Sequence, residues 1–423
     1  MIKKIAKSSS LLMSSNVFVA VGGLITISLI AKKLSISDLG IFAIIQTYVL
    51  AMNSLISFQT WYTVNKYYPL VKDDDRMLAS LLKYSYKLDL ITAAIGTMLS
   101  ILLINFLGNY INIPDSYFLI TQIFSLSILF NIVGTATGYF RSIDKYKVLV
   151  YSDIIATIFR VIGIIICYEF FPSIEAFLIV ILISFFVKTV YLNYSMLMHK
   201  LNAIILSDTS LIRKKFIDIH GYSITTSITN GFDILFRQGD ILLVSIFFGT
   251  YYAGVFKMIK TFSGLIGQVT GPISIVIYPI ISELIHKSQL KELKHLLLKS
   301  LMLLTLVGSV GLLLFIFLED RLITILFTSD YLIYTGYLNF YIFIIVLSIV
   351  FMAIHPIANL IGLHKETMYL TIIKLPIFII IIYLLKDYFS FKGFLIAVLI
   401  ETIITICIKF FWVYKKINTE RSK

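Results

Sequence analysis

The chain has 423 residues, of which 59% are hydrophobic and only 14% are charged, and its mean hydropathy is +0.93. Soluble domains are roughly 45–50% apolar and about 25% charged, so a soluble fold of this chain would expose large, aggregation-prone apolar patches. The composition therefore excludes soluble enzymes, nucleic-acid-binding proteins and secreted disulfide scaffolds. We expect an all-α polytopic membrane protein, because the apolar runs are long and continuous, unlike the alternating segments of a β-barrel.

About twelve apolar runs are long enough to cross a bilayer, since a spanning helix needs about 20 residues. The first six lie at about 10–31, 39–62, 84–107, 117–140, 148–169 and 173–196. The second six lie at about 218–248, 253–282, 296–318, 334–361, 367–385 and 392–413. A cytoplasmic connection at 201–217 then divides the chain into an N-terminal six-helix lobe, 1–200, and a C-terminal six-helix lobe, 218–423.

The two lobes share a short stretch of similar sequence. Ile27–Phe42 aligns without gaps to Ile241–Phe256, and both segments place a glycine, Gly40 or Gly254, before a β-branched residue and a phenylalanine. The identities are few, so a chance match stands beside an internal repeat. Because six spans is an even number, the lobes would be parallel repeats, related by an axis along the membrane normal.

The Lys and Arg residues outside the spans are distributed unevenly between the two sides. The connections that share a side with the N-terminus carry most of them. The opposite connections carry only Lys32, Lys33, Arg321, Lys386 and Lys392. Because cytoplasmic loops are rich in Lys and Arg, both termini are predicted to be cytoplasmic. Most of the net charge of +13 then reflects topology.

No catalytic, cofactor or metal site is predicted. None of the six histidines pairs with another histidine and a carboxylate at the spacing of metal ligands, and no phosphate-binding loop is present. Cys167 and Cys407 lie inside apolar runs, where a cysteine is usually a small buried hydrophobe. Asp73–Asp75 lies beside Lys72 and Arg76, which indicates a solvated charged turn. We therefore expect a protein that is not an enzyme.

Charged residues inside the predicted spans are the candidates for function, because a charge at the bilayer centre costs about 2.5–3.5 kcal/mol. The cations that could line a substrate cavity are Arg160, Lys188, Arg237, Lys257, Lys260 and Lys374. The acids that could pair with charges or couple ions are Asp89, Asp153, Asp233, Asp240 and Glu401. A cationic cavity would favour an anionic occupant such as a pyrophosphate. Structural ion pairs and snorkelling side chains are the alternative interpretation.

Spacing suggests which of these charges share a helix face. Asp233 and Arg237 are four residues apart and Lys257 and Lys260 are three apart, so each pair lies on one face. Asp153 and Arg160 are separated by two turns. Tyrosine-rich stretches at 62–68 and 331–341 suit interfacial belts or core packing, and stacking on sugar rings is the other possibility.

Several loose motifs resemble those of a known family. They are the N-terminal Lys3-Lys-Ile-Ala-Lys7-Ser, then Asn16 and Gly23 in the first span, Leu34-Ser-Ile-Ser-Asp38-Leu-Gly40, Arg237-Gln-Gly-Asp240, Phe248-Gly-Thr-Tyr-Tyr-Ala-Gly254 and Ile361-Gly-Leu-His-Lys365. With twelve spans, cytoplasmic ends and short loops, the whole chain resembles the Wzx-type polysaccharide-biosynthesis flippases of the MOP exporter superfamily.

The resemblance implies an alternating-access flippase in the bacterial cytoplasmic membrane. Its substrates would be undecaprenyl-pyrophosphate-linked oligosaccharide repeat units for O-antigen, capsule or exopolysaccharide. Its partners would be this lipid-linked anionic oligosaccharide, membrane lipids and the polysaccharide polymerase machinery, with no nucleic acid. The first span lacks a charge, which argues against lipid II as the substrate. A multidrug or organic-cation antiporter of the same superfamily is the alternative, and it would need an acidic cavity.

Overall fold

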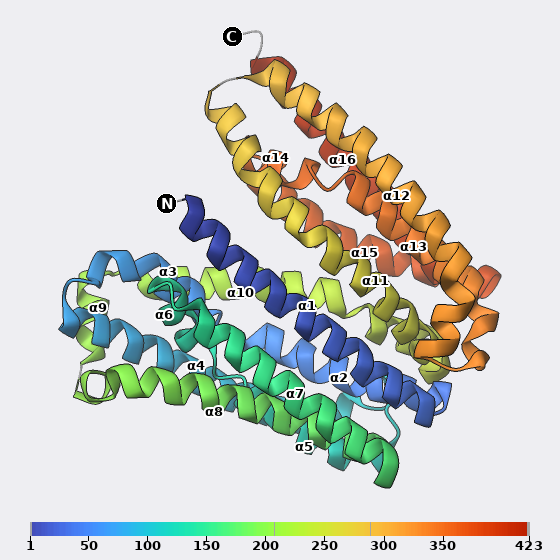
Figure 1. The fold of residues 1–423 in the computed structure, drawn as a ribbon, viewed down its shortest axis with the longest axis horizontal. Coiled ribbons are helices and arrows are strands. Elements are labelled where there is room, and N and C mark those ends of the chain that lie inside the picture. The colour runs from blue at the N-terminus through green and yellow to red at the C-terminus, as the bar shows by residue number, and fades with distance from the viewer. Residues whose placement is uncertain (1, 207, 288, 421–423) are drawn as a thin grey trace. The chain divides into compact units, whose positions relative to one another are not determined.

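The computed structural model describes residues 2–206, 208–287 and 289–420, and within these ranges the regular structure is helical throughout (Figure 1). The chain forms two compact units, Met1–Gly254 and Val255–Lys423. The boundary lies inside one helix, so the N-terminal unit includes chain that follows the predicted cytoplasmic connection. The arrangement as parallel six-helix repeats stays a prediction.

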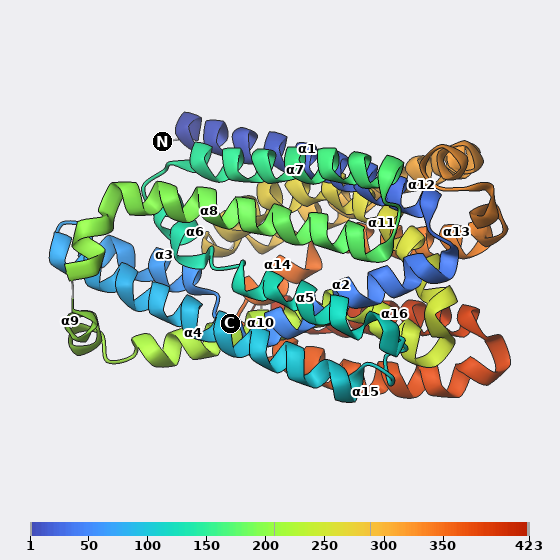
Figure 2. The ribbon, with the colours of Figure 1, turned by 90° about the horizontal axis from the view of Figure 1, so that it is seen from below.

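The N-terminal unit holds ten α-helices of the described chain and the first turns of an eleventh. Their bounds are α1 Ile2–Lys33, α2 Ile36–Ile56, α3 Thr60–Val71, α4 Asp75–Leu107, the 3-10 helix η1 Asp115–Tyr117, α5 Phe118–Leu129, α6 Gly134–Ser142, α7 Tyr146–Phe170, α8 Ile174–Leu206, α9 Thr209–Lys215 and α10 Ile219–Gln238. Helix α7 packs between α1 and α8, and α3 packs on α4 and α6 (Figure 2).

Helix α11, Asp240–His286, crosses from the first unit into the second. It bends at Gly249, whose φ of 83° is positive and therefore favours glycine. The remaining elements are α12 Leu290–Leu326, the 3-10 helix η2 Ser329–Tyr334, α13 Thr335–Val350, α14 Ile354–Leu360, α15 His364–Phe389 and α16 Phe391–Glu420. In this second unit α16 packs on α13, α14 and α15.

Eleven segments of the described chain are long and apolar enough to cross a membrane, one fewer than the sequence predicts. The predicted span at 218–248 is not among these eleven, and part of it, within 229–237, falls outside the residues whose side chains are described. In the structure it divides at Gly239 into α10 and the start of α11. Helix α10 packs against α2 and α3, and its Ser223 and Ser227 bond to Thr63 and to the backbone of Gln59. Contact with protein lets α10 be more polar than a lipid-facing span.

Three other predicted spans are helical but interrupted within their length. The run 39–62 is non-helical at 57–59 between α2 and α3. The run 117–140 breaks at 130–133 between α5 and α6, and the run 334–361 breaks at 351–353 between α13 and α14. Non-helical backbone at membrane depth requires hydrogen-bond partners from the protein or from a water-filled cavity.

Two helix starts follow directly from the sequence. Ser35 precedes α2, accepts a hydrogen bond from the Asp38 amide at 3.1 Å, and donates its hydroxyl to the Asp38 carboxylate at 2.7 Å. Asp74 precedes α4 and accepts from the amides of Arg76 and Met77 at 3.0 and 3.1 Å. These side chains satisfy amide groups that the first helical turn leaves unpaired. The charged turn at Asp73–Asp75 thus caps α4.

Gly40 and Gly254, which occupy matched positions in the sequence alignment, lie against each other's helix where α2 crosses α11. A Cβ on Gly40 would overlap the carbonyl oxygen of Thr250, and a Cβ on Gly254 would overlap the carbonyl oxygen of Ile36. Thr250 and Ile36 each lie four residues before the partner glycine, so the contact is reciprocal.

We predict that Gly40→Val destabilises the N-terminal unit by about 1–3 kcal/mol, because the added side chain would force α2 away from α11. The thermal midpoint of the purified protein measures this effect. Gly23→Val is the matched control, since a Cβ at Gly23 would meet no atom within 4 Å. Equal thermal midpoints for the two variants would contradict the proposed tight crossing.

Candidate functional site

Asp89 of α4 makes hydrogen bonds to the starts of α3 and α6, the helices that follow the two breaks in the N-terminal unit. Its side chain is buried, and one carboxylate oxygen accepts the Thr60 hydroxyl at 2.7 Å. The other oxygen accepts the Thr135 hydroxyl at 2.7 Å and the Thr135 amide at 2.9 Å. Thr60 is the first residue of α3 and Thr135 lies in the first turn of α6. The carboxylate therefore holds the points at which two helices restart.

The start of α6 depends on this carboxylate. Val133, the residue before α6, makes no side-chain capping bond, so Asp89 supplies the acceptor from another helix. Gly134 is required between them because a Cβ there would overlap the Thr60 hydroxyl and lie 3.0 Å from an Asp89 oxygen. An anion at a helix N-terminus is also favoured by the helix dipole.

Helix α8 satisfies backbone carbonyls in the break before α6. The Asn193 side-chain amide donates to the Ile132 carbonyl at 2.8 Å, and the Thr189 hydroxyl donates to the Phe130 carbonyl. These bonds replace the partners that a continuous helix would have supplied. The break is thus held inside the protein by the three helices α4, α6 and α8.

Lys188 of α8 is paired with Asp153 of α7, with 2.7 Å between ammonium nitrogen and carboxylate oxygen. The two side chains are 35% and 31% exposed. The spacing along α7 suggested Arg160 as a neighbour of Asp153, but the salt bridge forms across the helix pair. Lys188 therefore brings no uncompensated charge in this conformation.

Arg160 lies two helical turns beyond Asp153 on α7, and its side chain is half-buried. Its Nε is enclosed and has no hydrogen-bond partner among the described residues. A buried guanidinium nitrogen without a partner is costly, and such groups call for an explanation. Of the predicted cavity cations, Arg160 is the one whose described surroundings leave a donor unused.

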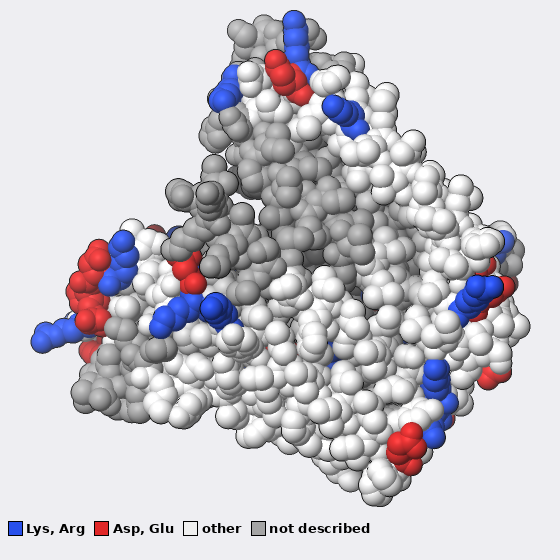
Figure 3. Space-filling model, viewed as in Figure 1, with Lys and Arg blue, Asp and Glu red and all other residues white. Residues whose placement is uncertain are grey.

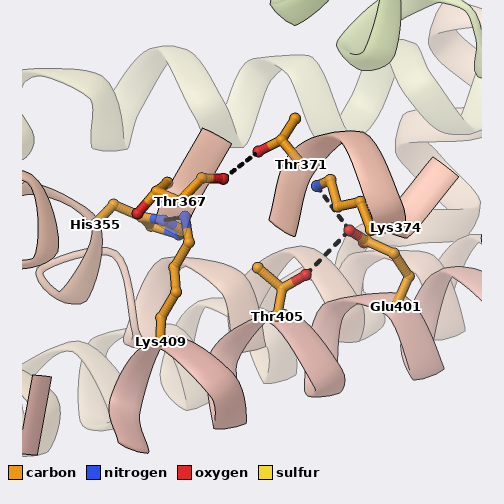
Figure 4. Close-up of polar contacts among 7 residues, drawn as sticks. All are labelled: His355, Thr367, Thr371, Lys374, Glu401, Thr405 and Lys409. Atoms are coloured by element: carbon orange, nitrogen blue, oxygen red, sulfur yellow. Dashed lines mark hydrogen bonds and ion pairs between the residues drawn. The ribbon is translucent and has the colours of Figure 1, made fainter. Parts of the chain in front are cut away.

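Lys374 of α15 is paired with Glu401 of α16 at 2.7 Å, and Thr405 donates to the same carboxylate oxygen at 3.2 Å (Figure 4). The pair lines a cavity of about 380 Å³ between these helices, together with apolar and aromatic side chains that include Phe378 and Trp412. The two helices of the second unit thus carry a lysine–carboxylate pair, as α7 and α8 do in the first.

Lys409 of α16 lies close to the break between α13 and α14. Its ammonium nitrogen is 2.8 Å from Nδ1 of His355, and the lysine is 7% exposed. Figure 4 shows the Lys409 ammonium group turned toward the His355 ring. Lys409 is not among the site residues predicted from the sequence. The one sequence feature that could have indicated its contact is a histidine at the start of α14.

The other predicted site residues lie on α10 and α11. Lys257 and Lys260 are half-buried in the second unit, and the carbonyls of these two residues accept the hydroxyls of Thr261 and Ser263. Asp240 begins α11 and accepts the amide of Ile241 at 3.0 Å. Arg237 and Asp233 lie on α10, and their side chains fall outside the described residues.

The visible surface separates charged from uncharged regions. On the face shown in Figure 3, most of the visible acidic and basic side chains lie in a few patches toward the outer edges, and a white band of described residues between these patches shows almost no charge. Such a band is expected where helices face lipid. The charges described above are therefore exceptions inside the apolar region.

We predict that Asp89→Asn lowers the free energy of unfolding by about 1–3 kcal/mol, because the amide cannot accept all three hydrogen bonds. The midpoint of chemical or thermal unfolding of the purified protein measures the loss. Asp73→Asn is the control, since Asp73 is exposed in a turn. An Asp89→Asn variant as stable as Asp73→Asn would refute the joining role.

We predict that Lys374→Met alone is more destabilising than Lys374→Met combined with Glu401→Gln. The single change leaves an unpaired carboxylate inside the apolar region, at a cost of up to about 2.5–3.5 kcal/mol. The unfolding midpoints of the two single variants and the double variant form a double-mutant cycle. Additive losses would show that the pair has no mutual stabilisation.

Comparisons with known proteins agree with this architecture. The family model for polysaccharide biosynthesis proteins matches residues 70–336. The inner membrane protein YghQ of Escherichia coli (strain K12) is 25% identical over 170 residues, which cover 40% of this chain and 48% of that protein. The matched part of this chain thus spans about half the length of that relative.

Solved structures share the fold over almost the whole chain. An inward-facing multidrug resistance MATE family transporter of the MOP superfamily has a TM-score of 0.75 and 12% identity, and the match covers 97% of this chain and 99% of that one. A MOP superfamily transporter from Pyrococcus furiosus, with a binding pocket of reverse polarity, has a TM-score of 0.67 and 13% identity over 98% and 96%. Identities this low show the fold alone.

The expected all-α membrane transporter fold is therefore confirmed. Because the family model covers more than half of its length, the chain belongs to the polysaccharide biosynthesis protein family, on the fold of the MOP superfamily transporters.

Proposed function

We propose that this protein is a flippase that moves lipid-linked oligosaccharide repeat units across the bacterial cytoplasmic membrane by alternating access. The observation that carries the proposal is the match to polysaccharide biosynthesis proteins in a chain with a transporter fold. The substrate is an undecaprenyl-pyrophosphate-linked unit for O-antigen, capsule or exopolysaccharide. Both termini face the cytoplasm, where such units are assembled, and a polymerase takes the product outside.

The buried arginine of α7 supports an anionic substrate. Arg160 has an unused donor, which a phosphate oxygen would accept strongly. Lys188 and Lys374 are neutralised by Asp153 and Glu401, so they meet substrate only in a conformation that separates these pairs. We therefore propose Arg160 as the first candidate for contact with the substrate phosphate. Arg237, Lys257, Lys260 and the two paired lysines are the further candidates.

A multidrug antiporter is the second candidate, since solved structures with this fold include multidrug resistance transporters. An organic cation would need an acidic side chain that is available to it. Asp153 and Glu401 each contact a lysine, and Asp89 accepts three hydrogen bonds. These contacts favour the flippase. Ion coupling by Asp89, Asp153, Asp233, Asp240 or Glu401 stays part of the proposal.

Deletion of the gene in its host tests the proposal. We expect a pyrophosphate-linked repeat unit to accumulate on the cytoplasmic side and the surface polymer to be lost, as measured by mass spectrometry and leaflet-specific labelling. Complementation with Arg160→Gln should restore less than about one tenth of the export, since a charged hydrogen bond is worth about 1.5–3 kcal/mol.

The control for complementation is Lys72→Gln, which removes an exposed charge from a turn. Both variants must reach the same protein level in the membrane. Normal glycans in the deletion strain, with altered sensitivity to cationic drugs, would instead establish the antiporter. Single repeat units that accumulate on the outer side would point to a polymerase.

A further inference from the structure

Two cations that sequence reasoning assigned to topology have no carboxylate partner among the described residues. Arg141 at the end of α6 and Lys66 in α3 both contact aromatic rings. The Arg141 guanidinium lies 4.6 Å from the centroid of Trp61, and the Lys66 ammonium lies 3.5 Å from the centroid of Tyr222. Two of the six cations that the sequence suggested for the cavity, Lys188 and Lys374, are instead neutralised by carboxylates. Arg141 and Lys66 thus carry positive charge that no described carboxylate neutralises.

A close helix crossing builds the site around Arg141. A Cβ on Gly138 would lie 2.8 Å from the Val64 side chain and 2.9 Å from the Trp61 backbone, so only glycine lets α6 approach α3 this closely. Arg141 lies one turn beyond Gly138 on the same face of α6. The crossing therefore sets the guanidinium over the indole, and cation–π contact restricts its position.

Two side-chain amides bond to residues that adjoin this arginine, one to its chain neighbour Ser142 and one to the indole on which it lies. Asn65 accepts the Ser142 hydroxyl at 3.0 Å, and Ser142 is the neighbour of Arg141. Gln59 accepts the Trp61 indole N–H at 3.2 Å. The Ser142 hydroxyl also lies 2.9 Å from the Gly138 carbonyl, so Asn65 shares its proton with that carbonyl. The NH₂ groups of Asn65 and Gln59 have no hydrogen-bond partner among the described residues. The side chains of Arg141, Ser142, Asn65, Gln59 and Trp61 are all half-buried.

We propose that Arg141, Asn65 and Gln59 form a binding site for the phosphate-bearing sugar of a glycosyl pyrophosphate. The guanidinium presents paired N–H donors that match phosphate oxygens, and it carries a charge that the protein leaves uncompensated. The two amides donate to sugar hydroxyls or to the second phosphate. Lys66 adds positive charge one residue from Asn65. Trp61 is a positioning residue that holds the guanidinium.

This site rests on the proposed flippase function and names the group that the protein recognises before translocation. The arginine lies at the end of the spanning segment that the charge distribution places on the cytoplasmic side. Lipid-linked sugars are assembled on that side, so a site there meets the substrate in its starting leaflet. A phosphate of an ordinary lipid headgroup offers part of the same chemistry, and the experiment separates the two sources.

The protein contains a built-in probe for this site, because it has only two tryptophans. Trp412→Phe leaves Trp61 as the single indole, in contact with Arg141. The variant is reconstituted as the full chain in phosphatidylcholine nanodiscs and titrated with farnesyl-pyrophosphoryl-N-acetylglucosamine. We expect a saturable change in Trp61 fluorescence, and a Kd that Arg141→Gln raises by about 10-fold or more, as loss of a charged hydrogen bond predicts.

Matched variants separate this site from general charge effects. Arg76→Gln removes an exposed arginine from the start of α4 and should leave the Kd unchanged. Arg141→Lys keeps the charge but loses the paired donors, so it should bind more weakly than the parent and more tightly than Arg141→Gln. Asn65→Ala should raise the Kd about 3–10-fold, as expected for one neutral hydrogen bond.

Three results would overturn the proposal. One is the absence of any saturable fluorescence change, and another is a Kd that Arg141→Gln does not alter. The third is an equal response when nanodiscs contain phosphatidylglycerol and no glycosyl pyrophosphate, which would mark a lipid-headgroup contact. Failure of the flippase function is read separately, from the glycans of the deletion strain. The binding site can therefore fail while that function stands, and the reverse also holds.

Discussion

Backbone hydrogen bonding inside an apolar medium is the constraint on which this structure depends. A continuous helix satisfies its own amides and carbonyls, but α2–α3 and α5–α6 are interrupted within spans that are otherwise apolar. One carboxylate, Asp89, and the side chains of α8 and α10 supply the missing partners. The broken helices thus exist because polar side chains of neighbouring helices meet them at the right depth.

The same constraint explains where the intramembrane charges lie. Asp153 and Glu401 each meet a lysine from the adjacent helix, and Lys409 meets His355 at the break before α14. Most charges that composition marks as unusual therefore have structural partners. Among the described arginines, Arg160 has a buried Nε without a hydrogen-bond partner and Arg141 stacks on Trp61 without a carboxylate partner, so substrate recognition is argued from these two residues.

Much of the fold could be predicted from the sequence, because apolar runs of spanning length are a strong signal. Gly40 and Gly254 occupy matched positions in the alignment of the two segments, but the alignment alone could not show that the two glycines are in contact. The breaks could not be predicted, since 57–59 and 130–133 contain neither proline nor glycine. Their cause is a side chain from elsewhere in the chain. Likewise, Asp153 pairs with Lys188 and not with Arg160 because of how α7 meets α8.

The path of α11 has a consequence for how such proteins can diversify. Helix α10 and the first turns of α11 follow the connection predicted at 201–217, but they belong to the N-terminal unit, where Ser245 bonds to the Ile111 carbonyl. Recombination at 201–217 would therefore exchange a piece of the first unit's core along with the second unit. A hybrid of two relatives keeps its native contacts only when the junction falls after Gly254, so the evolutionary module boundary differs from the loop boundary.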